Sequence, residues 1–98
     1  MNREDILNMT EMQLKFAVAE HIMGIAVSDY PLDIVAAWMV VDILSKRNIH
    51  FVIFSQNNIA MTFRNRFNGD YISEAGGGDD SITSAIYRAA LLAVMEFD

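Results

Sequence analysis

Cysteine is absent from this sequence of 98 residues. Without a thiol, the chain can form no disulfide bond, and it lacks both a thiolate nucleophile and a ligand on which structural zinc sites commonly depend. The two histidines, His21 and His50, lie on different predicted elements and do not make up for the missing ligand. We therefore expect no metal site and no cofactor.

Basic residues are scarce as well. Seven lysines and arginines stand against thirteen aspartates and glutamates, which gives a formal net charge of −6 at pH 7. Proteins bind duplex nucleic acid by neutralising its phosphates with Lys and Arg. We therefore do not expect duplex nucleic acid to be a partner of this protein.

Long hydrophobic runs are also missing. The longest run, residues 34–41, is too short to span a bilayer. Residues 1–13 are polar and charged, which is unlike a signal peptide. From these two features we expect a soluble, cytoplasmic protein that does not bind a membrane.

Hydrophobic residues, in contrast, are plentiful and make up 53% of the sequence. A chain of this length fits one domain, residues 1–98, and so small a domain leaves a large share of its surface exposed. The surplus of apolar residues predicts a homo-oligomer, at least a dimer, or a partner site. The alternative is a sheet that is covered on both faces.

Apolar residues at helical spacing predict a helix near the N-terminus. Thr10 and Gln13 form a capping-box pattern, and the residues that follow predict a helix over residues 11–23. A short capped turn through Leu7 precedes it. Gly24 stands where a C-terminal cap of this helix belongs.

Two further helices are predicted. The segment after Pro31 is apolar on nearly every side as far as Leu44, and such a helix lies in the centre of a protein or at an interface. We expect its tryptophan, Trp38, to be largely buried. The last helix is expected to begin after a cap at Asp80 or Ser81. Its predicted buried stripe comprises Ile82, Ile86, Ala89, Leu92 and Ala93.

Three strands are predicted before the last helix, over residues 49–55, 59–65 and 70–75. The pair Asn68-Gly69 is the strongest hairpin signal, and the glycines at 76–78 are expected to end the sheet. The element order α-α-β-β-β-α then gives an α+β fold with a three-stranded antiparallel meander. The first strand is apolar on both faces, which is typical of a strand covered on both faces.

The sequence as a whole resembles the phage ABA sandwich domain, a family of small proteins from phages and prophages of Bacillus-like bacteria. The resemblance covers nearly the whole chain and is strongest in "DIVAAW" at residues 33–38 and "IYRAALLAV" at residues 86–94. It implies an α/β/α sandwich, in which a small antiparallel sheet lies between helices, and it implies no established activity. The chain departs from the family pattern at Ile25 and Tyr87, where relatives often carry an aromatic residue and a small residue or Cys.

The stretch "EAGGGDDS", residues 74–81, leads into the last helix and raises the question of phosphate binding. It lacks the lysine of a Walker-type loop, and a dinucleotide-binding loop needs a parallel sheet that the predicted meander does not supply. Amides at a helix start can still bind an anion, although Asp79 and Asp80 would repel a phosphate. The favoured interpretation is a flexible joint followed by a helix cap.

Arg88 interrupts an otherwise apolar helical segment, and two interpretations are open. Its guanidinium can grip the phosphate or carboxylate of a ligand, or it can pair with a nearby acid such as Asp33 or Asp42. If the chain binds an anionic ligand, arginines and loop amides are the donors available. The candidate ligand-binding residues are Arg88, Arg64, Arg66, Tyr71, Gly77, Gly78 and Ser81. The sequence shows no nucleophile with an adjacent base, so no catalytic residue is predicted.

Two classes of function fit these observations. The first is a phage-encoded, non-enzymatic protein that sequesters a small anionic, nucleotide-derived immune signal in the host cytoplasm as a homo-oligomer. The phage resemblance, the excess of apolar residues, and the Arg and Tyr residues near the glycine run favour it. The second is a protein-binding inhibitor or adaptor that acts through its acidic or apolar surface.

Overall fold

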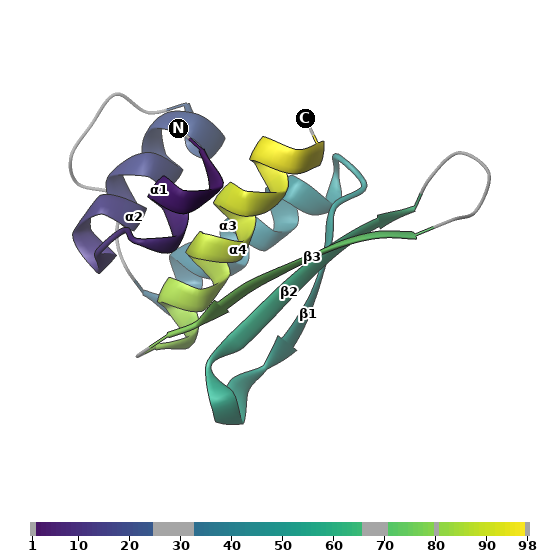
Figure 1. Cartoon of the computed structure of the whole chain (residues 1–98). Coiled ribbons are helices and arrows are strands. Elements are labelled where there is room, and N and C mark those ends of the chain that lie inside the picture. The colour runs from purple at the N-terminus through teal and green to yellow at the C-terminus, as the bar shows by residue number, and fades with distance from the viewer. Residues whose placement is uncertain (1, 25–32, 66–70, 80, 98) are drawn as a thin grey trace.

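The computed structural model describes residues 2–24, 33–65, 71–79 and 81–97, with the backbone alone at residues 65, 71–78 and 97 (Figure 1). Its helices are α1 (Arg3–Leu7), α2 (Glu11–Val18), the π-helical segment η1 (Ala19–Met23), α3 (Ile34–Ser45) and α4 (Ile82–Phe97). Its strands are β1 (His50–Phe54), β2 (Ile59–Asn65) and β3 (Tyr71–Gly78), and the 3-10 turn η2 (Ser55–Asn57) joins the first two. The predicted mixture of helices and strands, an α+β fold, is confirmed. Within the described ranges, no helix has both the length and the apolar character that crossing a membrane requires.

The N-terminal helices begin at the caps that the sequence predicts. The Gln13 amide donates to Thr10 Oγ1 at 3.3 Å, and the Thr10 amide donates to Gln13 Oε1 at 2.9 Å. Asn2 forms the same reciprocal pattern at α1. Gly24, at φ +69°, ends η1 in a conformation that residues with side chains rarely adopt. The predicted helix over residues 11–23 is therefore confirmed, with the difference that its final segment widens into a π-helix.

The strands pair antiparallel in the order β1-β2-β3. β2 has the predicted bounds, but β3 is longer than predicted because it continues through the glycines. Ala60 faces Gly76 and Ile59 faces Gly78, with an irregular register between the two pairs. The expectation that residues 76–78 end the sheet is thus wrong. β2 extends far enough to pair with their backbone, and glycine tolerates the irregular geometry of a bulge.

The last helix, α4, is the centre of the fold. Every residue from 83 to 93 is buried, so the helix is enclosed well beyond the predicted stripe. One side of α4 lies on β2 and β3, and its other sides contact α1, α2 and α3 (Figure 1). Small side chains leave room for these neighbours, namely Ala85, Ala89, Ala90 and Ala93.

Within the described ranges, helices cover one face of the sheet (Figure 1). Figure 1 shows α1, α2, α3 and α4 gathered on one side of the strands. On that side Phe51 and Ile53 pack against the core, whereas Val52 and Phe54 on the opposite side are 43% and 49% exposed. For the described part of the chain, the predicted sandwich with the sheet between helices is therefore wrong. The other helices surround α4 instead of crossing the sheet, because α4 offers them buried apolar surface on several sides.

α3 packs one side against the core and leaves the other in solvent. Its N-cap is Asp33, whose Oδ1 accepts a hydrogen bond from the Ala36 amide at 2.8 Å. Trp38 is 52% exposed, so the prediction that it is largely buried is wrong. This helix is apolar on nearly every side, and periodicity alone does not show which side faces inward. The inward side is the one with Ala36 and Ala37, because small residues allow α3 to approach α4 closely.

The burial pattern predicts that the same truncation, leucine to alanine, lowers the free energy of unfolding by different amounts at two positions. Leu91 is fully buried in α4, whereas Leu7 is 48% exposed at the end of α1. Leu91→Ala is expected to lower the free energy of unfolding by about 2–5 kcal/mol, because it leaves a cavity in the core. Leu7→Ala, the matched control, is expected to lower it by about 1 kcal/mol or less. Urea denaturation followed by circular dichroism measures both, and equal losses would contradict this core.

Candidate functional site

Arg88, the charged residue within the apolar last helix, is buried and fully hydrogen-bonded. Its Nε and Nη2 donate to the two carboxylate oxygens of Asp79, at 3.2 and 2.8 Å. Its Nη1 donates to the carbonyl oxygens of Ile6 and Leu7 at 2.7 and 3.0 Å, and Nη2 also donates to that of Met9 at 3.0 Å. These hydrogen bonds use all five N–H groups of the guanidinium.

The Arg88 contacts join three segments that are distant in sequence: the end of α1, the connection between β3 and α4, and α4 itself. Carbonyls in the last turn of a helix have no partner within the helix, so Arg88 supplies the donors that α1 lacks. Of the two interpretations open from the sequence, the structure shows pairing with an acid. That acid is Asp79, which was not one of the two acids considered from the sequence. Of those two, Asp33 caps α3 and Asp42 pairs with Lys46 at 3.4 Å.

Ser81 acts as the cap of α4, as predicted. Its Oγ accepts a hydrogen bond from the Ser84 amide at 3.1 Å and donates to the Ser84 hydroxyl at 3.0 Å. Ser84 is fully buried and donates in turn to Glu11 Oε1 at 3.0 Å, which ties α4 to α2. The Ser81 hydroxyl therefore has a partner within the protein both as a hydrogen-bond acceptor and as a donor.

The remaining predicted ligand residues are not among the hydrogen-bond partners of Arg88. Arg64 is half-buried on β2, and Gly77 and Gly78 belong to β3 rather than to a loop. Arg66 lies outside the described residues. For Tyr71 only the backbone is described, paired with Asn65. Of the candidates whose side chains the structure describes, Arg88 and Ser81 are engaged in hydrogen bonds within the protein, and the anion site stays a prediction.

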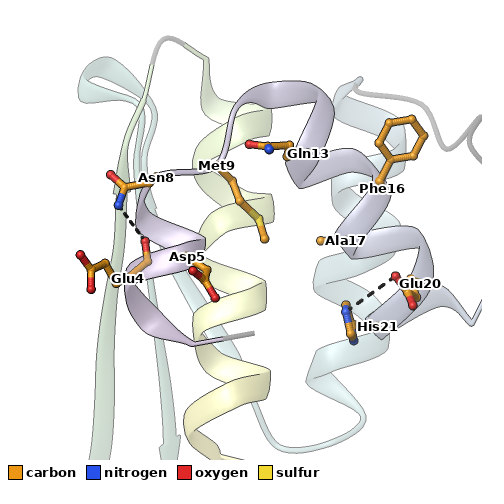
Figure 2. A pocket seen from close by; sticks show the side chains of 9 residues that line it. All are labelled: Glu4, Asp5, Asn8, Met9, Gln13, Phe16, Ala17, Glu20 and His21. Carbon is orange, nitrogen blue, oxygen red and sulfur yellow. Dashed lines mark hydrogen bonds and ion pairs between the residues drawn. The ribbon is translucent and has the colours of Figure 1, made fainter.

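A groove of about 680 Å³ lies between α1 and the helix formed by α2 and η1 (Figure 2). Met9, which follows α1, lies between the two walls. One wall carries Glu4, Asp5 and Asn8, and the other carries Gln13, Phe16, Ala17, Glu20 and His21. Because Arg88 binds the carbonyls at the end of α1 and of Met9, it fixes the position of the first wall.

The groove combines carboxylates with apolar residues, of which Met9 between the walls and Ala17 on α2 form what we call its apolar base (Figure 2). Glu20 and His21 lie side by side on η1 with 3.9 Å between Oε2 and Nε2, and their side chains are 75% and 42% exposed (Figure 2). On the opposite wall, the Asn8 side-chain amide donates to the Glu4 carbonyl at 3.0 Å. Among the described residues, no three His, Asp or Glu side chains are close enough to hold a metal ion. Carboxylates spread along a groove suit an extended cationic ligand better than a single ion.

The groove is not among the sites that the sequence predicts. Its signals were present, because the caps at Asn2 and Thr10 locate two helices separated by a short connection. They do not give the angle between these helices, which depends on the distant Arg88. They also do not indicate the π-helical turn, a feature that is frequent at functional sites and that sets where Glu20 and His21 lie on the wall.

In comparisons with known proteins, no family model, no curated protein and no solved structure matches the chain. The resemblance to the phage ABA sandwich domain stays a prediction. The groove is therefore interpreted from its own geometry and charge.

Removal of the Arg88 side chain is expected to destabilise the whole fold. Arg88→Ala removes the donor from the nearly buried Asp79 carboxylate and from the Leu7 and Met9 carbonyls, and it leaves the Ile6 carbonyl with the Met9 amide, which should cost about 3–5 kcal/mol of unfolding free energy. Arg88→Lys should also be less stable than wild type, because an ammonium cannot reproduce the forked geometry. Chemical denaturation measures both losses.

The matched control is the double variant Arg88→Ala/Asp79→Ala. It should be more stable than Arg88→Ala alone, because it no longer buries an unpaired carboxylate. An Arg88→Ala variant with wild-type stability would contradict the structural role of this side chain.

Proposed function

We propose that this protein is a non-enzymatic binding module whose α1–α2 groove accepts a basic, partly apolar segment of another protein. The observation that carries the proposal is the lining of the groove, where the acidic Glu4, Asp5 and Glu20 occur together with the apolar Met9 and Phe16. The stem of a lysine or arginine can lie along the apolar base while its charged end meets a carboxylate. This role belongs to the second functional class expected from the sequence, an inhibitor or adaptor.

The charge of the whole protein supports a basic partner. A net charge of −6 attracts cationic segments over a distance and raises the rate at which they associate. Exposed carboxylates such as Glu20 contribute modestly to affinity, since solvent screens them. Most of the affinity should therefore come from the apolar base, and the carboxylates should orient the partner.

Sequestration of an anionic nucleotide, the first functional class, has less support. Its central donor, Arg88, already donates all its N–H groups within the protein, and the α1–α2 groove would repel a phosphate. Isothermal titration calorimetry against cyclic nucleotides tests this class. Binding by wild type that is lost in Arg64→Ala would favour nucleotide capture over the proposed role.

A phage origin, which the resemblance of residues 33–38 and 86–94 predicts, would make the partner a protein of the bacterial host. No catalytic role is proposed. In the series of hydrogen bonds from Ser81 through Ser84 to Glu11, the hydroxyl that contacts the carboxylate is that of Ser84, which is fully buried and so is closed to a substrate.

Fluorescence polarisation with a short labelled peptide of alternating Arg and Leu tests the proposed groove. Wild type is expected to bind this probe, and binding should weaken as salt is raised because part of the attraction is electrostatic. The double variant Glu4→Gln/Glu20→Gln should bind about fivefold to thirtyfold more weakly, as the loss of two exposed charge pairs worth about 0.5–1 kcal/mol each predicts.

The matched control is Glu96→Gln, an exposed carboxylate on α4 that does not line the groove. It changes the net charge by as much as either single substitution. Because Glu96 lies outside the groove, Glu96→Gln should leave binding within about twofold of wild type. If Glu96→Gln weakens binding as much as Glu4→Gln does, the peptide is attracted by overall charge alone and the groove is not its site.

A further inference from the structure

Exposed apolar side chains are concentrated on α3. Four large hydrophobic residues of this helix, Ile34, Val35, Trp38 and Met39, are exposed, and among the described residues no other helix or strand exposes more than two. Val35 is 68% exposed and Trp38 is 52% exposed. Spacings of three and four residues place Val35, Trp38, Met39 and Asp42 along one side of the helix. We call this side the α3 stripe.

The α3 stripe combines a shallow groove with the exposed side chain of Trp38. A shallow groove of about 380 Å³ is lined by Val35, Trp38, Met39, Asp42 and Ile43. A helix face of this kind can match a rotated copy of itself, because the projecting side chains of one helix enter the hollow of the other. Tryptophan at the centre of such a face is the residue type that most often dominates an interface.

The charges on the α3 stripe favour a second copy of the chain as its partner. Asp42, the acid on the stripe, pairs with Lys46 one turn later at 3.4 Å, so together they carry no net charge. The protein as a whole carries −6, and two copies would repel each other if they met through acidic surfaces such as the α1–α2 groove. A basic foreign segment would be drawn to that groove rather than to a neutral apolar stripe.

We propose that α3 pairs antiparallel with α3 of a second copy, about a two-fold axis near Trp38 and Met39. This arrangement sets the two helix dipoles in opposite directions and seats each Trp38 against the groove of the other copy. α3 has 12 residues, which corresponds to a length of about 18 Å. The interface is therefore smaller than a standard one of about 1,600 Å², and dissociation constants in the micromolar range are expected.

Sedimentation velocity and Trp38 fluorescence, measured over the same range of protein concentrations, test the dimer. Trp38 is the single tryptophan of the chain, so its emission reports on this stripe. As concentration rises, the mass should increase from 11.0 kDa towards twice that value. The emission should shift to shorter wavelength with the same midpoint, because pairing removes Trp38 from water.

Substitutions at exposed positions locate the interface. Val35→Glu/Met39→Glu should weaken dimerisation about 100-fold, because it places charge in an apolar contact. Phe54→Glu, on the uncovered face of the sheet, is the matched control and should leave dimerisation unchanged. Circular dichroism checks folding, and if the double charge variant does not fold, Val35→Ser/Met39→Gln provides the same comparison.

Three results would overturn the proposal. The first is a wild-type mass of 11.0 kDa at every concentration up to the highest that stays in solution. The second is a dimer that forms without any shift in Trp38 emission. The third is a dimer that survives Val35→Glu/Met39→Glu and is lost in Phe54→Glu, which would place the interface on the sheet. None of these results bears on the α1–α2 groove, because the dimer is proposed independently of what that groove binds.

Discussion

The buried guanidinium of Arg88 attaches the end of α1 to α4 and to the segment that precedes α4. A buried charge is tolerated only when it is paired and its hydrogen bonds are complete. Here Asp79 supplies the opposite charge, and carbonyls at the end of α1 accept the remaining hydrogen bonds. α1 has five residues, too few to be stable as an isolated helix. Its position, and with it one wall of the groove, therefore depends on a side chain that belongs to α4.

The groove and the α3 stripe divide the surface of the protein into regions with different chemistry. The groove is acidic with an apolar base, and the stripe is apolar with a neutral ion pair between Asp42 and Lys46. They lie on helices that contact α4 separately. A change of a few surface residues on one of them can therefore alter one kind of recognition and leave the other intact.

Local features of the fold were predictable from the sequence, because they depend on residues close together in the chain. The caps at Thr10 and Ser81, the left-handed Gly24 and the bounds of β2 are of this kind. The coverage of the sheet and the exposure of Trp38 were not predictable. A strand with two apolar faces, or a helix that is apolar all round, gives no information on which face has a neighbour.

The candidate site was harder to predict than the fold for a related reason. The sequence singled out Arg88 correctly as unusual, but three of its partners are backbone carbonyls, which carry no signature in the sequence. The acids of the groove are ordinary surface residues when read one at a time. They form a site only because a π-helical turn and a distant arginine set the two walls side by side.

Arg88 is synthesised 82 positions after Ile6, the residue whose carbonyl it binds. A ribosome therefore completes α1, α2 and the strands before it makes α4, the helix on which α1, α2, β2 and β3 pack. The apolar sides of those elements emerge with nothing to cover them, and the core closes only when α4 has left the exit tunnel. The domain therefore completes its core only after α4 has been made, and the nascent chain has to stay free of aggregation until then.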